Sequence, residues 1–198
     1  MTCTATPSGP LDPPMTEKFV LVIIDGLRYS DGLGDPTFAN VPRMAALASE
    51  GTIIEPFQMD GNTVTAHGVA TIMNGPDDPP IAFFDTTCGE NSLHAPHPTM
   101  AEYYRQQLGK PASDCQYILG PYCPWRGSFD PFYGPAYWPQ WVVSPGPNTD
   151  NAVWANTQGV IATDAPDFLI VYLPEVDSKG HAGVLPDYIA AIQNADQI

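Results

Sequence analysis

The sequence predicts an α/β fold in which helices flank a mostly parallel sheet. Two continuous apolar runs rich in β-branched residues, FVLVII at 19–24 and DFLIVYL at 167–173, are typical of strands buried on both faces of such a sheet. Segments with helical periodicity lie between and after these runs, so strands and helices alternate along the chain. A hydrophobic content of 43% with only 15% charged residues predicts a folded core rather than a disordered chain.

The first expected elements follow a leader. Residues 1–17 are rich in Pro, Ser and Thr and show no periodicity, which predicts a flexible leader ahead of the folded part. The run 19–24 is the first expected strand. After a loop of Gly and Asp residues, a helix is expected to begin at Val41-Pro42 and to stop at Gly51. Pro is favoured in the first turn of a helix, and Gly just after the last.

Short elements are also expected in the middle of the chain. Residues 52–57 are interpreted as a second strand, and residues 66–73 as a helix of small side chains that ends before an Asn-Gly-Pro turn. The segment 98–108 is the clearest helix of this region, because Gly109 closes it. Residues 116–119 follow as a strand.

The last part of the chain begins with a long irregular segment. Residues 121–147 carry aromatic side chains among many Pro and Gly, which favours an insertion or cap rather than a sheet strand. The strand at 167–173 follows, and residues 185–198 have the apolar spacing of a helix. Residues 18–198 are therefore expected to form one α/β domain that contains this insertion.

The charge balance excludes several classes of partner. Seven Lys and Arg residues stand against 22 Asp and Glu, and the net charge is -15. Without a basic cluster, the chain is not expected to bind a nucleic acid polymer or an anionic membrane surface. No apolar run approaches the ~20 residues of a membrane helix, and the N-terminus lacks the basic and apolar parts of a signal peptide. A soluble protein is expected, and its localisation is unknown.

Acidic residues follow both of the strongest predicted strands. Asp25 comes directly after the first strand, and Glu175 and Asp177 come after the other. Ligands of open parallel sheets bind outside the carboxyl ends of the strands, so functional residues are expected here. A plain turn remains the alternative for Asp25-Gly26 taken alone.

A hydroxyl group stands where the loop 61–68, GNTVTAHG, meets the expected helix at 66–73. The Thr65 side chain at this junction can cap the helix. The same junction places phosphate or sulfate on the N–H groups of the first helical turn, so Thr65 is equally well placed to attack a bound anion. Both roles are open for this residue.

The third segment of interest is YLPEVDSKGH at 172–181. Asp177 and His181 are four residues apart, and Gly180 allows a tight bend between them. Carboxylate and imidazole are ordinary zinc ligands, so the pair can hold one cation. A salt bridge at the start of a helix is the alternative.

Together, D-G-L-R at residues 25–28, the threonine-containing junction and D-S-K-G-H resemble the alkaline phosphatase superfamily. The similarity is to its type I phosphodiesterase/nucleotide pyrophosphatase branch and to the phosphoglycerate mutase-like metalloenzymes, and it spans about residues 18–198. It implies an alkaline phosphatase-like fold and two divalent cations, Zn²⁺ or Mn²⁺. The implied ligands are Asp25 for one cation and Asp177 with His181 for the other. Thr65 would be the nucleophile and bridge toward the first cation.

The resemblance leaves two threonines as nucleophile. Family members place a Gly ten residues after the nucleophile, which Thr65 satisfies with Gly75. Other members have a His four residues after it, which Thr63 satisfies with His67. Thr65 is preferred because it stands immediately before the helix, where N–H groups are available.

The resemblance implies a metal-dependent phosphoric ester hydrolase, either a phosphodiesterase or a monoesterase, that cleaves a small-molecule phosphate ester. In that family a D-H-G element and a distant His complete the two metal sites. This sequence has no Asp-His dipeptide and continues for only 17 residues after His181. The chain is therefore expected to lack the C-terminal part of such a hydrolase.

Two alternatives follow from the same residues. One is a truncated, catalytically inactive remnant that acts as a binding module. The other is a phosphomutase or sulfatase on the same scaffold. Sulfatases of this family carry a modified Cys or Ser in place of Thr65, which argues against that activity.

Overall fold

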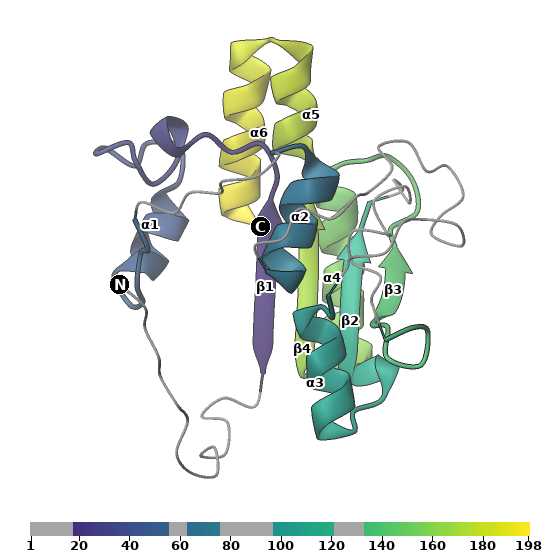
Figure 1. Cartoon of the computed structure of the whole chain (residues 1–198). Helices are drawn as coiled ribbons and strands as arrows, with labels where there is room; N and C mark the ends of the chain where they lie inside the picture. Colours follow the sequence, from purple (N-terminus) through teal and green to yellow (C-terminus); the bar gives the residue numbers. More distant parts are fainter. Residues whose placement is uncertain (1–17, 56–62, 76–96, 121–132) are drawn as a thin grey trace.

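Parallel strands form the central sheet of the molecule. The computed structural model describes residues 18–55, 63–75, 97–120 and 133–198 (Figure 1). Within these residues the sheet has four strands, in the spatial order β1 (Phe19–Ile24), β4 (Phe168–Leu173), β2 (Cys115–Leu119) and β3 (Gln140–Val143). Every neighbouring pair is parallel, which confirms the predicted α/β class.

Helices cover both faces of this sheet. The described α-helices are α1 (Pro42–Ala48), α2 (Thr65–Asn74), α3 (Met100–Leu108), α4 (Asp150–Thr163), α5 (Glu175–Ala182) and α6 (Leu185–Gln197). In Figure 1, α2 and α3 lie in front of the strands and α4 lies behind them. The short 3₁₀ turns η1 (Tyr29–Asp31) and η2 (Ala112–Asp114) complete the described elements. No helix in the described ranges is both long and apolar enough to cross a bilayer.

Strand β4 divides the core into two clusters because successive side chains of a strand point to opposite faces. Phe168, Ile170 and Tyr172 pack with residues of α2 and α3. Leu169, Val171 and Leu173 pack instead with residues of α4 and α6. Every residue of this strand is buried, as its unbroken apolar sequence predicts.

Strand β1 is less buried than its sequence predicts. It lies at the edge of the sheet and pairs with β4 alone among the described strands. Val20 and Val22 are 58% and 50% exposed, because none of the described helices covers that edge as α4 and α6 cover the centre. The prediction of a strand buried on both faces is therefore wrong for β1 and right for β4.

The helices predicted at 66–73, 98–108 and 185–198 are confirmed as α2, α3 and α6. Helix α3 shows why its bounds were readable from sequence. Thr99 and Glu102 form a reciprocal capping box at its start, and Gly109 adopts a left-handed conformation, with φ +64°, at its end. Local side-chain chemistry therefore marks both ends of this helix.

Two predictions about strands are wrong, one of a strand at 52–57 and one of a strand-free segment at 121–147. Residues 52–55 form no strand, because no described strand lies beside them, and residues 56–57 fall outside the described residues. Strand β3 lies inside the segment that was expected to hold no strand. Its prolines, Pro139 and Pro145, flank the paired residues and so leave the ladder with β2 intact. The leader 1–17 and residues 121–132 are outside the described ranges.

Candidate functional site

One cavity of about 620 Å³ lies at the carboxyl end of the sheet. Its lining includes the predicted metal ligands and both candidate nucleophiles, namely Asp25, Thr63, Thr65, Asp177 and His181, but not the strand-end acid Glu175. Asp25 follows β1, the two threonines lie at the start of α2, and Asp177 and His181 belong to α5, which follows β4. These segments are distant in sequence but meet at one cavity, as expected from the rule that ligands bind beyond the carboxyl ends of parallel strands.

Thr65 directs its hydroxyl at Asp25. The Thr65 Oγ1 atom donates a hydrogen bond to Asp25 Oδ2 at 2.9 Å. Helix α2 begins at Thr65, and its N-cap residue is Val64, which provides no side-chain cap. The capping alternative for Thr65 is therefore not what the structure shows. The hydroxyl lies in the cavity at the N-terminal end of a ten-residue helix.

Asp25 has a second donor that sequence reasoning missed. The Oη atom of Tyr172, on β4, donates to the same Asp25 Oδ2 atom at 2.5 Å. Burial first, and then the charge of Asp25, raise the pKa of the Tyr172 phenol well above its usual range. Tyr172 therefore remains a protonated hydrogen-bond donor at all ordinary pH values.

Asp177 and His181 are neighbours on α5. His181 Nε2 lies 3.5 Å from Asp177 Oδ1. The predicted bend at Gly180 is wrong, because the helix continues through it and ends at Ala182, followed by Gly183, whose φ is +72°. The four-residue spacing brings the two side chains together through one helical turn instead. An ion pair between them, the alternative considered above, requires a protonated imidazole.

The two carboxylates of the cavity influence each other. The pKa of Asp177 is raised, first by burial and then by the negative charge of Asp25, while His181 opposes the shift. The Asp177 side chain is 26% exposed and the His181 side chain is 82% exposed, so His181 lies at the mouth of the site. A cation between the two acidic groups would relieve their repulsion.

Gly26 allows the loop after β1 to approach α5. Its φ is +73°, and a Cβ atom at this position would lie 2.6 Å from the Cα atom of Asp177. Only glycine tolerates both this backbone conformation and this separation. The close approach brings the loop that follows Asp25 next to the helix that carries Asp177, and both aspartates line the cavity.

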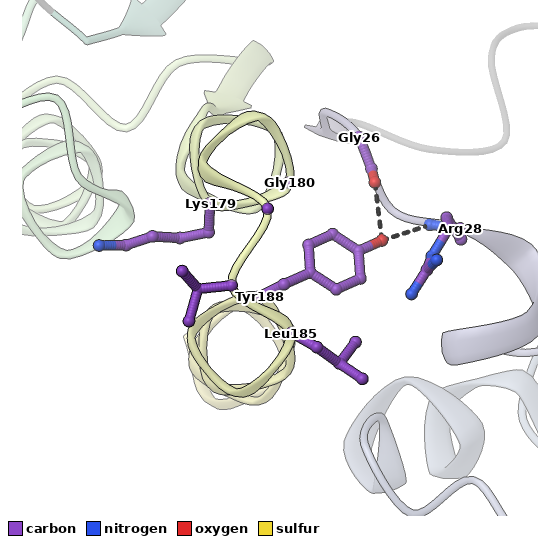
Figure 2. Close-up of a pocket in the computed structure, with 8 residues that line it drawn as sticks. Gly26, Arg28, Lys179, Gly180, Leu185 and Tyr188 are labelled. Atoms are coloured by element: carbon purple, nitrogen blue, oxygen red, sulfur yellow. Dashed lines mark hydrogen bonds between the residues drawn. The ribbon is translucent and has the colours of Figure 1, made fainter.

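Tyr188 of α6 holds the same loop from its other side. Its Oη atom accepts a hydrogen bond from the N–H of Arg28 at 3.0 Å and donates one to the carbonyl of Gly26 at 2.9 Å (Figure 2). The Arg28 guanidinium lies over the ring, 4.9 Å from its centroid, and pairs with Asp31 at 2.5 Å. Gly26, Arg28 and Tyr188 line a second pocket, of about 310 Å³.

Further polar residues of the site come from the loops after β3 and β4. Asn148 lines the main cavity, and its Oδ1 atom is buried without a hydrogen-bond partner among the described residues. Asp150 and Glu175 begin α4 and α5 and exchange hydrogen bonds with each other. Sequence reasoning named Glu175 as a strand-end acid but missed Asn148 and Asp150. The Asn-Thr-Asp run at 148–150 was the available signal, because Thr and Asp favour helix N-termini.

The donors that could hold metal ions are few. Within the described ranges, no group of three or more His, Cys, Asp and Glu side chains is placed to bind a metal ion. The four predicted ligands form two pairs in the cavity lining, Asp25 with Thr65 and Asp177 with His181. Their oxygen and nitrogen chemistry fits Zn²⁺ or Mn²⁺, but two protein donors are fewer than the three of a catalytic zinc site.

Comparison with known proteins identifies no relative. No family model, curated protein sequence or solved structure matches the chain.

Proposed function

We propose that this protein is a metal-dependent phosphoric ester hydrolase with an alkaline phosphatase-like fold. One observation carries the proposal. The hydroxyl of Thr65 lies at the start of α2, inside the cavity, and donates to the carboxylate of Asp25. A nucleophilic hydroxyl, an acidic partner and a helix N-terminus that favours anions are thereby combined in one place. A small-molecule phosphate ester is the substrate that suits such a combination.

Thr65 would attack the phosphorus atom of the bound ester. Its hydroxyl proton leaves along the hydrogen bond to Asp25 Oδ2, a bond from Thr65 Oγ1 to phosphorus forms, and the bond to the leaving oxygen breaks. A water oxygen then bonds to phosphorus, the bond from phosphorus to Thr65 Oγ1 breaks, and the proton held by Asp25 Oδ2 returns to Oγ1, which restores the hydroxyl and the carboxylate. Throughout, the N-terminal end of α2 favours the negative charge of the phosphoryl group.

Divalent cations would be held by the two donor pairs. We assign Asp25 and Thr65 to one cation and Asp177 and His181 to the other. When bound, Zn²⁺ or Mn²⁺ would supply Lewis-acid stabilisation of the charge on the phosphoryl oxygens. Water and substrate oxygens would fill the remaining coordination positions.

A matched pair of threonine variants tests this function. Hydrolysis of p-nitrophenyl phosphate and of bis(p-nitrophenyl) phosphate is measured with added Zn²⁺ or Mn²⁺ in the wild type, Thr65→Val and Thr63→Val. Thr65→Val should reduce hydrolysis to the background rate, whereas Thr63→Val should retain it. The reverse result would make Thr63 the nucleophile. A wild-type protein that cleaves neither ester with either metal would refute the proposal.

A binding module is the second candidate, because each proposed cation has only two donors within the described residues. Calorimetric titration with Mn²⁺ and then with a phosphate ester distinguishes the candidates. Binding of both without turnover would favour the module. Cleavage of p-nitrophenyl sulfate in place of the phosphate esters would instead indicate a sulfatase, and phosphoryl transfer between two hydroxyl groups of a sugar phosphate would indicate a phosphomutase.

A further inference from the structure

Tyr172 reaches the candidate site from inside the sheet. It is 3% exposed on β4 and belongs to the core cluster between the sheet and helices α2 and α3. It pairs with Ile23 of β1, two residues before Asp25. The N–H of Asp25 continues this ladder by donating to the carbonyl of Leu173 at 3.1 Å. Backbone pairing therefore fixes Asp25 and Tyr172 relative to each other.

Both hydroxyl donors use the same oxygen of Asp25. Tyr172 Oη and Thr65 Oγ1 donate to Oδ2, at 2.5 Å and 2.9 Å. Oδ1 receives no hydrogen bond within the described part of the chain. A carboxylate held in this way keeps one oxygen for the hydroxyls and leaves the other for a ligand.

The two donors differ in what the proposed reaction does to them. Thr65 loses its proton when it attacks phosphorus, and from that moment it no longer donates to Asp25. Tyr172 is buried and takes no part in the bond changes, so its hydrogen bond persists. Of the two, only Tyr172 can hold the carboxylate in one orientation through the whole reaction.

We propose that Tyr172 is a positioning residue, whose hydroxyl orients the Asp25 carboxylate so that Oδ1 binds a divalent cation while Oδ2 accepts from Thr65. This inference rests on the proposed function, since it concerns the cation and nucleophile of that site. Its physical basis is that the hydrogen-bonding partners of metal-ligating side chains fix their orientation, and their loss typically costs 10- to 100-fold in metal affinity or activity.

The first experiment compares two tyrosines of the same core cluster. Tyr172→Phe removes only the hydroxyl that contacts Asp25. Tyr104→Phe is the matched control, because Tyr104 packs on Phe168 at the opposite end of β4, with its centroid 5.1 Å from that ring. Mn²⁺ affinity by calorimetry, kcat and KM are measured for both. Tyr172→Phe should lower Mn²⁺ affinity and kcat by about 10- to 100-fold. It should leave KM within threefold, and Tyr104→Phe should match the wild type. Equal affinity and kcat in Tyr172→Phe and the wild type would overturn the inference.

A second measurement needs neither turnover nor the Tyr172→Phe protein. 3-Fluorotyrosine at position 172 keeps the ring and the hydroxyl and gives one ¹⁹F resonance, recorded with Asp25 and with Asp25→Asn. The resonance should differ between the two proteins and should move when Zn²⁺ is added to the protein with Asp25. An unchanged resonance in Asp25→Asn would overturn the inference. If the wild type shows no metal binding and no hydrolysis, the proposed function fails, while the Asp25→Asn comparison still decides whether Tyr172 holds Asp25.

Discussion

Asp150 and Glu175 each bind the backbone of the other. The N–H of Asp150 donates to Glu175 Oε2 at 3.1 Å, and the N–H of Glu175 donates to Asp150 Oδ1 at 2.9 Å. Each residue is the first of its helix, α4 or α5, where N–H groups lack partners within the helix. The exchange therefore joins the starts of α4 and α5, close in sequence to Asn148 and Asp177, which line the cavity.

This contact predicts a pH dependence of stability. Burial raises the pKa of Asp150 from 3.8 to about 6; the N–H bond from Glu175 opposes the shift and the charge of Glu175 adds to it. Because the folded protein binds this proton more tightly than the unfolded chain, the stabilisation is complete below 3.8 and is lost as pH rises through about 6. The free energy of unfolding should therefore gain about 1 kcal/mol from Asp150 between pH 7 and pH 5.

Urea unfolding at pH 5 and pH 7 checks this, with Asp150→Asn as the reference because the amide keeps an acceptor for the N–H of Glu175. The variant should lack the gain at pH 5. The same difference between the two pH values in both proteins would show that Asp150 does not titrate in this range.

Removing the Tyr188 hydroxyl should loosen the loop that follows β1. Tyr188→Phe deletes both hydrogen bonds to that loop, leaving the N–H of Arg28 and the carbonyl of Gly26 without this partner. Loss of a partly buried hydrogen-bond partner should lower the free energy of unfolding by about 1–3 kcal/mol. Denaturant unfolding measures the change. Tyr104→Phe is the control, since its hydroxyl has no hydrogen bond in the described part of the chain. Similar losses in the two variants would contradict the role of Tyr188.

Gly26 should be far less tolerant of a methyl group than another glycine of similar conformation. Gly26 and Gly109 have φ values of +73° and +64°, so an alanine at either is strained by about 1–2 kcal/mol. Only at Gly26 would the new Cβ meet backbone, 2.6 Å from the Cα atom of Asp177, whereas nothing lies within 4 Å at Gly109. Gly26→Ala should therefore be more destabilising than Gly109→Ala by at least about 1 kcal/mol in thermal or urea unfolding. Equal losses would mean that the close approach to α5 is not rigid.

The site residues that could be predicted from sequence are those marked by a short local sequence pattern. Asp25 and Asp177 could be found because each follows an apolar strand, and Thr65 because it precedes a helix. Tyr172 could not be found in this way. It lies inside an apolar run, and its partner Asp25 is 147 residues away in sequence. The Tyr172 side chain belongs to the hydrophobic core, so its sequence context indicates a core residue and nothing more. Only the sheet register reveals what its hydroxyl contacts.

The same distinction explains the errors in the fold. Helix α3 was predicted because its start and end signals are local, in Thr99 and Gly109. Helix α4 was missed although Thr149 caps it, because two of its four buried residues, Asp150 and Thr157, are polar and blur the apolar periodicity of its buried face. Strand β3 was missed because its fit depends on a contact with another strand, Trp141 against the ring of Tyr117 at 4.7 Å. Tertiary packing decided both elements.

Substitution of Asn148 should affect the stability of the protein and its proposed activity differently. Its Oδ1 atom is buried in the cavity wall without a hydrogen-bond partner among the described residues, which is unfavourable in a folded protein. Asn148→Ala should therefore leave the free energy of unfolding unchanged or raise it by up to about 1 kcal/mol. If the amide contacts the phosphate ester, the same variant should lower kcat/KM about tenfold, equivalent to about 1.4 kcal/mol of transition-state stabilisation.

Asn156 provides the matched control for this substitution. Asn156 lies on α4, outside the cavity lining, and its Nδ2 atom donates to Ser144 Oγ at 3.3 Å. Asn156→Ala should lose about 0.5–1.5 kcal/mol of stability and leave kcat/KM unchanged, the opposite of Asn148→Ala. Urea unfolding and hydrolysis of p-nitrophenyl phosphate give both values for each variant. A destabilised Asn148→Ala protein with wild-type kcat/KM would show that this amide supports the loop and not the substrate.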